Sequence, residues 1–307
     1  MHLTLRQLEV FAAIARHENV SRAARQLALS QSAASNALAE LERQFDCPLF
    51  DRIGKSLRLN AQGIALLPRA DDLLDRAAEI ESLLAGKALG PLSLGATLTI
   101  GNYLATLVVA EYLQRHPESR LEFSVANTAQ VTDRLLRCQL DLGMIEGESR
   151  HPDIAVEPWL DDALVVFCAP SHPLAGSPRV APALLAKQRW VIREPGSGTR
   201  AVLERAMGRY AGQLDIRLTL EHTEAIKRAV ESGLGVGCLS RLALREAFRR
   251  GSLVELPTPG LDLSRRFLFA WHRQRTPSAA MRTFMALCRE MAGPATNTAA
   301  LTLPYIS

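Results

Sequence analysis

Hydrophobic residues near the start of the chain recur at helical spacing and predict three helices. From Leu5 to Arg16 they fall three or four positions apart, as on one face of an amphipathic helix. Ser21 can cap a second helix, Arg22 to Ala28, and Ser30 can cap a third that runs to Phe45. A short helix, a turn and a longer helix form a helix-turn-helix arrangement. The expected buried positions of the second and third helices are Ala23, Ala24, Leu27, Ala33, Ala34, Ala37, Leu38 and Leu41.

A small basic hairpin is expected directly after these helices. The apolar turn Pro48 to Phe50 tucks under the domain, and Arg52 to Leu59 can then form two short strands. Gly54 would lie at the tip of the hairpin, with Lys55 and Arg58 exposed. Such a hairpin beside a helix-turn-helix has the form of a wing.

One long helix is expected from about Asn60 to Lys87, with Asn60 as its cap and Gln62 in its first turn. A helix of about 26 residues would be ~39 Å long. Its apolar residues keep a spacing of three and four, close to a heptad repeat, and no partner for them lies nearby in the sequence. Pairing with a second copy of the chain is therefore favoured, and packing on the later part of the same chain is the alternative. The apolar stripe comprises Leu67, Ala70, Leu74, Ala77, Ile80 and Leu84, and the acidic residues on the other faces are Asp71, Asp72, Asp75, Glu79 and Glu81.

Beyond Gly90 and Pro91 the pattern changes to strands that alternate with helices. Such alternation predicts mainly parallel sheets with helices on both faces, and ligands then bind beyond the carboxyl ends of the strands. The tail, Pro294 to Ser307, has a weak pattern and is expected to be mobile or to pack late. The expected strands are 92–96, 121–126, 140–145, 164–169, 190–193, 216–220, 235–239 and 266–271, and the expected helices are 103–115, 131–139, 199–210, 224–232, 242–249 and 279–291.

Length and composition narrow the class of protein. A chain of 307 residues, 48% hydrophobic and 22% charged, is globular with two or three domains, which excludes long disorder. No apolar stretch approaches the roughly 20 residues of a membrane span, and the charged N-terminal stretch is unlike a secretory signal. The five cysteines lie far apart and are expected to be reduced thiols in the cytoplasm. The net charge of +4 allows a nucleic-acid partner without requiring one.

The third helix carries the polar residues that base recognition requires. A helix that lies in a major groove presents its N-terminal residues to base edges, where Gln and Asn can pair bidentately with adenine and Ser can donate or accept. Basic residues of the hairpin are suited to phosphate contacts. The alternative is a three-helix bundle with an ordinary polar surface. The candidate DNA-contacting residues are Ser21, Arg22, Gln31, Ser32, Ser35, Asn36, Arg52, Lys55 and Arg58.

These N-terminal residues resemble the DNA-binding domain of LysR-type transcriptional regulators. The similar stretch is LRQLEVFAAIARHENVSRAARQLALSQSAASNALAELERQFDCPLFDR, followed by LRLNAQG, and the resemblance extends over essentially the whole chain. It implies an α+β multidomain protein: a winged helix-turn-helix in residues 1–60, a dimerising linker helix in 61–89, and a two-lobed α/β effector domain like a periplasmic binding protein in 90–307. Two residues depart from the family pattern. Asn36 stands where members often carry arginine, which leaves the bases read open, and Asn60 replaces the usual threonine cap.

The resemblance also places an effector cleft between lobe I, at about 90–161 and 267–293, and lobe II, at about 162–266. One wall is the motif EPGSGTR, Glu194 to Arg200, whose glycines allow backbone N–H groups to converge at a helix start that suits an anion. An ordinary turn with a helix cap is the alternative for this motif, as capping is for each threonine. Glu146 could repel an anion or bind an amine or hydroxyl, and Arg200 could add charge or lie on the surface. The expected effector-binding residues are Thr97, Thr99, Asn127, Thr128, Glu146, Gly196, Ser197, Gly198, Thr199 and Arg200.

The hypothesis that follows is a LysR-type regulator, not an enzyme, whose binding to promoter DNA responds to a small anionic effector. The implied partners are double-stranded promoter DNA, further copies of the chain as a homodimer or homotetramer, the small-molecule co-inducer and RNA polymerase, with no cofactor, metal or membrane. An enzyme is disfavoured because the sequence has no Gly-x-Ser-x-Gly elbow, His-Glu-x-x-His motif or Walker motif. A solute-binding protein is disfavoured by the N-terminal segment. The EPGSGTR form resembles regulators of carbon fixation and sulfur metabolism.

Overall fold

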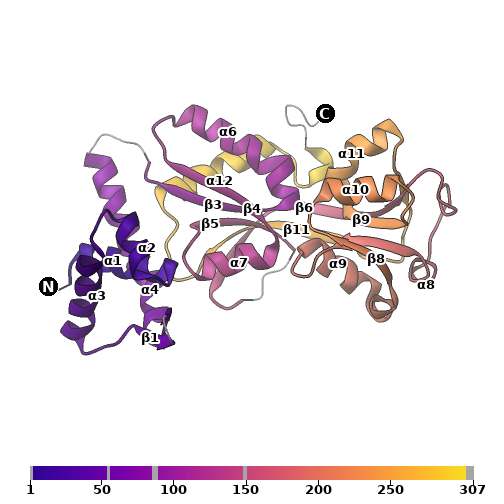
Figure 1. The fold of residues 1–307 in the computed structure, drawn as a ribbon. Coiled ribbons are helices and arrows are strands. Elements are labelled where there is room, and N and C mark those ends of the chain that lie inside the picture. Colours follow the sequence, from indigo (N-terminus) through magenta and orange to yellow (C-terminus); the bar gives the residue numbers. More distant parts are fainter. Residues whose placement is uncertain (1–2, 54–55, 85–88, 148–150, 302–307) are drawn as a thin grey trace.

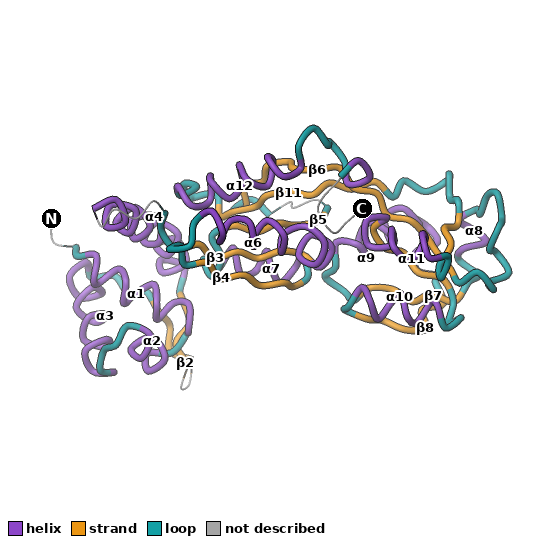
Figure 2. The backbone as a smooth tube through the Cα atoms, turned by 90° about the horizontal axis from the view of Figure 1, so that it is seen from above, coloured by secondary structure: helices purple, strands orange, loops and turns teal. Residues whose placement is uncertain are grey.

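The molecule is an elongated row of three units (Figure 1). The computed structural model describes residues 3–53, 56–84, 89–147 and 151–301. A helical N-terminal domain lies at one end, lobe I of the α/β region is in the middle, and lobe II forms the far end. Figure 2 shows the same order from above, with helices on both sides of the strands.

The N-terminal domain has the expected helix-turn-helix and wing. Its elements are α1 (Leu5–His17), α2 (Val20–Gln26), α3 (Gln31–Phe45), β1 (Phe50–Ile53) and β2 (Ser56–Leu59), with β1 antiparallel to β2. Ser30 caps α3 as predicted, because its side chain accepts from the backbone N–H of Ala33. The core of this domain includes Phe11 and Phe50, whose rings meet edge to face at 5.8 Å.

Two details of the N-terminal prediction are wrong. Asn19, and not Ser21, caps α2, since the Asn19 side chain accepts from the N–H of Arg22 at 2.9 Å. The helix therefore begins two residues earlier than expected. Ala33 is exposed, whereas Ala34, Leu38 and Leu41 are buried. The buried stripe of α3 is narrower than the apolar residues suggest, because alanine on a solvent-facing position is compatible with any helix.

The linker helix α4 (Ala61–Leu84) begins at Asn60, whose Oδ1 accepts from the N–H of Gly63 at 2.9 Å. The first half of its apolar stripe has a partner within the chain that is distant in the sequence. Leu67 and Ala70 are buried in the same core as α1. Farther along, Leu73, Ile80 and Leu84 are exposed, so the uncovered apolar face includes Leu73, where the prediction had Leu74.

The acidic residues of α4 bind the rest of the chain. Asp71 pairs with Arg16 of α1, and Asp75 pairs with Arg275, which also contacts Asp141 of lobe I at 2.7 Å. The Arg275 side chain is only 6% exposed. These contacts, which we call the linker latch, tie the DNA-binding domain to lobe I through one face of the linker helix. The later part of the chain thus packs on the acidic face of α4, whereas the sequence-based alternative concerned the apolar stripe.

The α/β region has parallel strands within each lobe and two long antiparallel strands that join the lobes. The strands lie in the order β4-β3-β5-β11-β6-β9-β7-β8, with β10 beside β6. Lobe I has β3 (Leu92–Thr97), β4 (Leu121–Ala126) and β5 (Leu142–Glu146), and lobe II has β7 (Arg189–Arg193), β8 (Asp215–Leu220), β9 (Val236–Ser240) and β10 (Val254–Leu256). The joining strands are β6 (Ile154–Cys168) and β11 (Ser264–His272).

Helices cover both faces of each lobe, as Figure 1 shows. In lobe I, α6 and α12 pack on one face and α7 on the other. In lobe II, α8 and α9 cover one face and α10 and α11 the other. The remaining elements are α5 (Leu98–Ile100), the π-helix η1 (Gly101–Ala105), α6 (Thr106–Arg115), α7 (Thr128–Leu136), α8 (Pro182–Leu185), α9 (Gly198–Met207), η2 (Gly208–Gln213), α10 (Thr223–Glu231), α11 (Arg241–Arg250), α12 (Ala279–Ala292) and η3 (Thr298–Ala300).

The sheet departs from the prediction at the junction between lobes. The antiparallel pairs β6–β11, β5–β11, β6–β9 and β6–β10 make the sheet only half parallel. The first half of β6 and the short β10 are strands that the sequence pattern does not predict. Pro158, Asp161 and Asp162 have weak strand propensity, so the first half of β6 cannot be recognised as a strand from the sequence. The expected 103–115 helix begins instead as a short π-helix before α6.

Candidate functional site

The predicted DNA-reading residues lie together at the exposed start of α3. Gln31, Ser32, Ser35 and Asn36 are all exposed, and no charged residue occurs between Gln31 and Ala39. The opposite face of α3 is buried against α1 and α2, so the helix is held rigidly. The arrangement therefore offers amide and hydroxyl groups, without competing charge, on one helix start. The Ser32 hydroxyl also lies 3.0 Å from the Ser30 hydroxyl.

Basic residues flank this helix start. Arg22 is exposed at the start of α2, and Arg58 is exposed on β2 of the wing. Arg52 lies on β1, opposite Leu57, and Lys55 is outside the described residues. Ser21 is partly buried on α2, and its carbonyl accepts from Arg25 at 3.4 Å. Exposed cations on α2 and on the wing, in the same domain as an uncharged helix start, are suited to phosphate contacts.

In the effector region, the start of α9 in lobe II meets the start of α7 in lobe I. The N–H of Gly198 donates to the Thr128 hydroxyl at 3.2 Å, and the N–H of Ala129 donates to the carbonyl of Gly196 at 3.1 Å. A Cβ on Gly198 would lie 2.5 Å from the Glu146 carbonyl oxygen, so only glycine permits this approach. The glycine motif therefore faces lobe I, and these two backbone contacts join it to protein atoms across the cleft.

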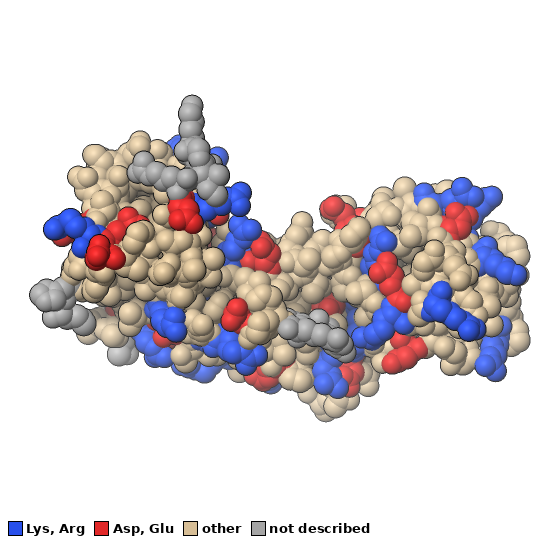
Figure 3. All heavy atoms as spheres, turned by 90° about the horizontal axis from the view of Figure 1, so that it is seen from below, with Lys and Arg blue, Asp and Glu red and all other residues tan. Residues whose placement is uncertain are grey.

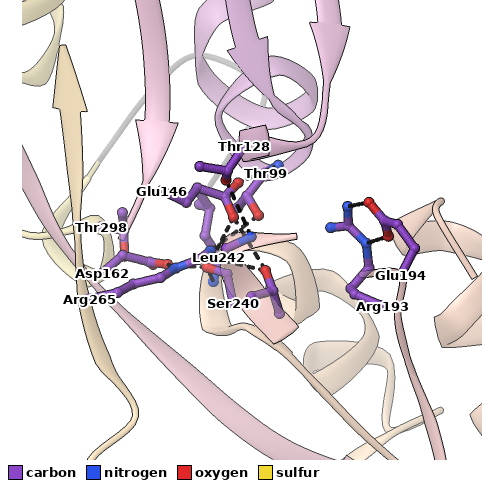
Figure 4. A network of polar contacts seen from close by, with 12 residues as sticks. Thr99, Thr128, Glu146, Asp162, Arg193, Glu194, Ser240, Leu242, Arg265 and Thr298 are labelled. Atoms are coloured by element: carbon purple, nitrogen blue, oxygen red, sulfur yellow. Dashed lines mark hydrogen bonds and ion pairs between the residues drawn. The ribbon is translucent and has the colours of Figure 1, made fainter. Parts of the chain in front are cut away.

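The centre of the cleft is an ion cluster around Arg265 (Figure 4). Its guanidinium group is fully buried and binds two carboxylates, Glu146 of β5 and Asp162 of β6, the latter at 2.7 Å. It also donates to the hydroxyl of Thr199 at 2.9 Å and to that of Thr99 at 3.2 Å. The cluster thus joins residues of both lobes through one arginine on the joining strand β11.

Glu146 is held in the ionised form by this cluster. Burial alone would raise the pKa of its carboxyl, but the Arg265 charge and the hydrogen bond from Thr99 hold that pKa below its ordinary value. The N–H of Thr99 donates to Glu146 Oε1 at 2.9 Å, and the Thr199 hydroxyl donates to Oε2 at 3.2 Å. Glu146 thus binds protein donors from both lobes, and the two alternatives for its role toward a ligand stay predictions.

Three hydroxyls at the starts of helices in the two lobes are buried without a hydrogen-bond partner. They are those of Thr97, Ser197 and Thr223, which stand at the starts of α5, α9 and α10. Thr97 and Ser197 are the N-caps of their helices but make no side-chain capping bond. The Thr97 hydroxyl lies near enough to Glu146 to help lower the pKa of that carboxyl, although it forms no hydrogen bond of ordinary geometry with it. Because unsatisfied buried hydroxyls are costly, a ligand at these helix starts would find donors that the protein does not fully use.

Other predicted residues have partners in their own lobe. Asn127 caps α7, where its side chain accepts from the N–H of Gln130. Arg200 binds Glu204 at 2.7 Å and the Arg193 carbonyl at 3.3 Å. A hollow of about 620 Å³ opens beside the lobe contact and is lined in part by Thr128, Gly147 and Arg200.

Two classes of site find no support in the described part of the chain. There, no group of three or more His, Cys, Asp or Glu residues is arranged to hold a metal ion. Within the same residues, no helix has both the length and the apolar character that crossing a membrane requires. All five cysteines are free thiols.

Comparison with known proteins identifies the family. Residues 5–64 match the bacterial regulatory helix-turn-helix protein, lysR family, and residues 85–293 match the LysR substrate binding domain. The chain belongs to the LysR family of transcriptional regulators. This LysR-type regulator therefore combines a DNA-binding helix-turn-helix with an effector-binding domain, as the sequence predicted.

Several relatives cover nearly all of this LysR-type regulator. The HTH-type transcriptional regulator YeiE of Escherichia coli K12 is 42% identical over 94% of this chain and 98% of its own. The RuBisCO operon transcriptional regulator of Allochromatium vinosum is 33% identical, covering 92% of this chain and 95% of its own. Among solved structures, a full-length OxyR variant of Pseudomonas aeruginosa has a TM-score of 0.73 at 24% identity, covering 94% and 95%, which shows the shared fold. The Synechocystis CcmR regulatory domain in complex with 2-PG has a TM-score of 0.60 at 28% identity, covering 65% and 96%.

Two residues at the centre of this LysR-type regulator's cleft, Arg265 and Asp162, are not among the sequence-based candidates. A signal for them was nevertheless present in the sequence. Arg265 shares the inward phase of its strand with Phe267 and Phe269, and Asp162 shares that of Leu160 and Leu164. Charged residues on the buried phase of a strand need a partner, and they mark a polar centre.

Proposed function

We propose that this LysR-type regulator binds promoter DNA sequence-specifically through the start of α3, and that a small anionic effector in the cleft between the lobes modulates this binding. The observation that carries the proposal is the presence on one chain of an exposed, uncharged helix start and of a buried cleft with unsatisfied hydroxyls. The protein then acts as a regulator, not as an enzyme.

In this proposal the nine DNA-contacting candidates divide into two groups. Gln31, Ser32, Ser35 and Asn36 read base edges, and the remaining five, Ser21, Arg22, Arg52, Lys55 and Arg58, contact the backbone. Hydrogen bonds to bases give specificity, whereas charge contacts give affinity that falls with salt. A variant of the first group should therefore lose discrimination between sequences, and a variant of the second should lose affinity for all of them.

The effector would bind at the helix starts that carry Thr97, Ser197 and Thr223. Helix N-termini favour negative charge, and the unsatisfied hydroxyls supply donors. An anion there would compete with Glu146 for the donors of Arg265, Thr99 and Thr199, and the ion cluster would rearrange. Since a ligand shifts a conformational equilibrium only by its differential affinity, this exchange of partners is the step that would favour one lobe geometry. The related CcmR regulatory domain, solved in complex with 2-PG, supports a small ligand in a domain of this fold.

We further propose that two copies join through the uncovered face of α4. Leu73, Ala77, Ile80 and Leu84 recur at spacings of four, three and four, as along a coiled-coil seam, and three of them are strongly exposed. Pairs of dimers, contact with RNA polymerase and action in the cytoplasm belong to the same proposal. The boundaries 1–60, 61–89 and 90–307 are part of it too. So is the assignment to the branch of regulators of carbon fixation and sulfur metabolism.

Fluorescence anisotropy with labelled promoter duplexes at two salt concentrations tests DNA binding. Salt-sensitive binding with preference for one duplex is expected, and folded protein that binds no promoter fragment would overturn the proposal. Thermal shift against carboxylates, phosphates, sulfur oxyanions and aromatic acids tests the ligand class, because a specific ligand raises apparent stability by mass action.

The variant Ser197→Ala locates the effector site. Ser197 Oγ has no partner in the protein, so its removal leaves the unliganded protein as stable as before. The thermal shift caused by an active anion should shrink. Ser171→Ala, an exposed serine elsewhere in lobe II, is the control. An undiminished shift in the Ser197 variant would place the anion elsewhere.

A further inference from the structure

The tail after α12 is not loose in the described range but crosses the junction between the lobes. The N–H of Asp161 donates to the carbonyl of Thr296 at 2.9 Å, and Asn297 forms a parallel bridge with Asp161. Leu301, only 4% exposed, is buried in the core of lobe I. From lobe II, Arg245 of α11 donates to the carbonyl oxygens of Thr298 at 2.8 Å and Leu301 at 3.2 Å. Both lobes therefore hold residues 294–301, which we call the tail strap.

One side chain of the tail strap reaches the ion cluster. Thr298 is 3% exposed, and its hydroxyl donates to Asp162 Oδ1 at 2.6 Å. The hydroxyl of Ser240 donates to the same oxygen at 2.8 Å, and Arg265 Nε donates to Oδ2 at 2.7 Å. Figure 4 shows Thr298 on the far side of Asp162 from Glu146, with Arg265 between the two carboxylates. A continuous chain of contacts thus runs from the tail through Asp162 and Arg265 to the cleft.

We propose that the tail strap completes the effector site and that Thr298 is a positioning residue for it. By fixing Asp162, Thr298 orients the guanidinium of Arg265, and Arg265 in turn orients Glu146, Thr99 and Thr199. The inference rests on the proposed function in taking these residues to be the effector site. Its physical basis is independent of the proposed function. A fully buried carboxylate requires donors on both oxygens, and each missing donor leaves the carboxylate free to turn.

The hydroxyl group of Thr298 distinguishes a role in positioning Asp162 from a role in packing the tail. Leu301 and Arg245 already hold the tail in place, so the hydroxyl is not needed for docking. A valine would fill the same volume. Only serine or threonine, however, combines a small size with a donor for Asp162. The proposal therefore predicts that the cleft responds to the hydroxyl and not to the bulk of residue 298.

Hydrogen–deuterium exchange on the full chain without any ligand tests the strap. The amide of Thr99 is a direct reporter, because it donates to Glu146 at 2.9 Å. In Thr298→Val, exchange in 97–101 and 196–200 should rise by about tenfold, the factor expected when a hydrogen bond to a charged group is lost. Thr298→Ser should behave as the native chain. Thr296→Val is the matched control, since Thr296 is exposed on the same tail.

Two results would overturn the proposal. One is faster exchange of Thr298→Val confined to 294–301, with the cleft unchanged. The other is equal disturbance of the cleft by Thr298→Ser and Thr298→Val, which would show that shape and not the hydroxyl matters. If Thr298→Val folds poorly, Ser240→Ala replaces it in the test, because it removes the other hydroxyl donor of Asp162. The exchange rate in the same cleft segments should then rise in Ser240→Ala. The serine and Thr296 variants remain the controls.

Failure of the strap can be told from failure of the proposed function. The exchange readout needs no ligand, whereas the anionic effector is tested by thermal shift with inorganic phosphate and sulfate among the probes. Where an anion does shift the native chain, Thr298→Val should weaken its apparent affinity several-fold. An unchanged affinity there, with altered exchange in the cleft, would show that the strap does not act on the effector site.

Discussion

The start of α3 and the cleft between the lobes both have polar side chains at helix starts, but these side chains are exposed in one region and buried in the other. At α3 the residues Gln31, Ser35 and Asn36 are exposed and face away from the core of their domain. In the cleft, Thr99, Thr199 and Glu146 are buried and bind one another through Arg265.

The difference follows from what each region must recognise. A duplex brings its own surface, so the reading groups need only be displayed on a rigid helix. A small ligand has to be surrounded, and the groups that would surround it must satisfy each other while it is absent. The cleft residues can therefore exchange their hydrogen-bond and ion-pair partners for those of a ligand. The residues at the start of α3 have few such partners to lose.

Arg265→Met is expected to have the largest effect, because it removes the cation that binds the cleft residues together. It leaves Glu146 and Asp162 buried without their cation, which costs about 3–5 kcal/mol of unfolding free energy when a buried pair is broken. Urea denaturation of the full chain at neutral pH measures the loss in the effector domain. Arg266→Met, at the exposed neighbour that pairs with Asp161, should cost little.

The same variant should reverse a pH dependence. In the native chain the lowered pKa of Glu146 means that its stabilisation is present above its ordinary value of 4.5 and is lost as the pH falls through the folded-state pKa. Without Arg265, burial should raise that pKa, so acid would stabilise the variant. The difference in unfolding free energy between the variant and the native chain should then be largest at neutral pH. A difference that does not change with pH would show that the pKa of Glu146 does not depend on Arg265.

Arg275→Met tests whether the two regions are coupled through the linker latch. It leaves Asp75 and Asp141 facing each other, with a cost of about 2 kcal/mol after allowing for their partial exposure. Thermal denaturation should show the DNA-binding domain and lobe I separating into two transitions. Arg76→Met, at an exposed pair within α4, is the control, and a single unshifted transition would show that the latch does not couple the domains.

Ser35→Ala with Asn36→Ala tests the exposed side of the comparison. Specific DNA affinity should fall by about 1–3 kcal/mol, the value of one bidentate base contact, while affinity for unrelated DNA stays the same. Anisotropy against both kinds of duplex measures the ratio. Gln44→Ala, near the other end of α3, should change neither affinity. An equal loss for both duplexes would mean that these residues do not read bases.

The smallest effect is expected for Tyr103→Phe. The Tyr103 hydroxyl of lobe I donates to Glu224 of lobe II at 2.8 Å, and Lys227 holds the same carboxylate at 2.7 Å. Removing one partly exposed hydrogen bond between lobes should cost about 0.5–1 kcal/mol. Faster amide exchange at the starts of α6 and α10 would reveal it, and Tyr210→Phe, within lobe II, is the control. No change would show that this contact does not help to close the lobes.

Local pattern was enough for most helices and for the parallel strands, and it was insufficient for the first half of the joining strand β6. The caps at Ser30 and Asn60, the two long stripes of α1 and α4 and the parallel strands β3 and β4 follow from residues a few positions apart. The first half of β6 does not, because its proline and aspartates become a strand only when β11 pairs with it.

The amino-acid order alone determined the helix-turn-helix, the wing, the linker helix and the family, since each depends on short-range spacing. Only the tertiary structure decided that Arg265, Asp162 and Thr298 share one buried cluster, and that α4 turns its acidic face inward. Asp162 lies more than a hundred positions from both Arg265 and Thr298. The role of a buried charge depends on the opposite charge that folding places next to it.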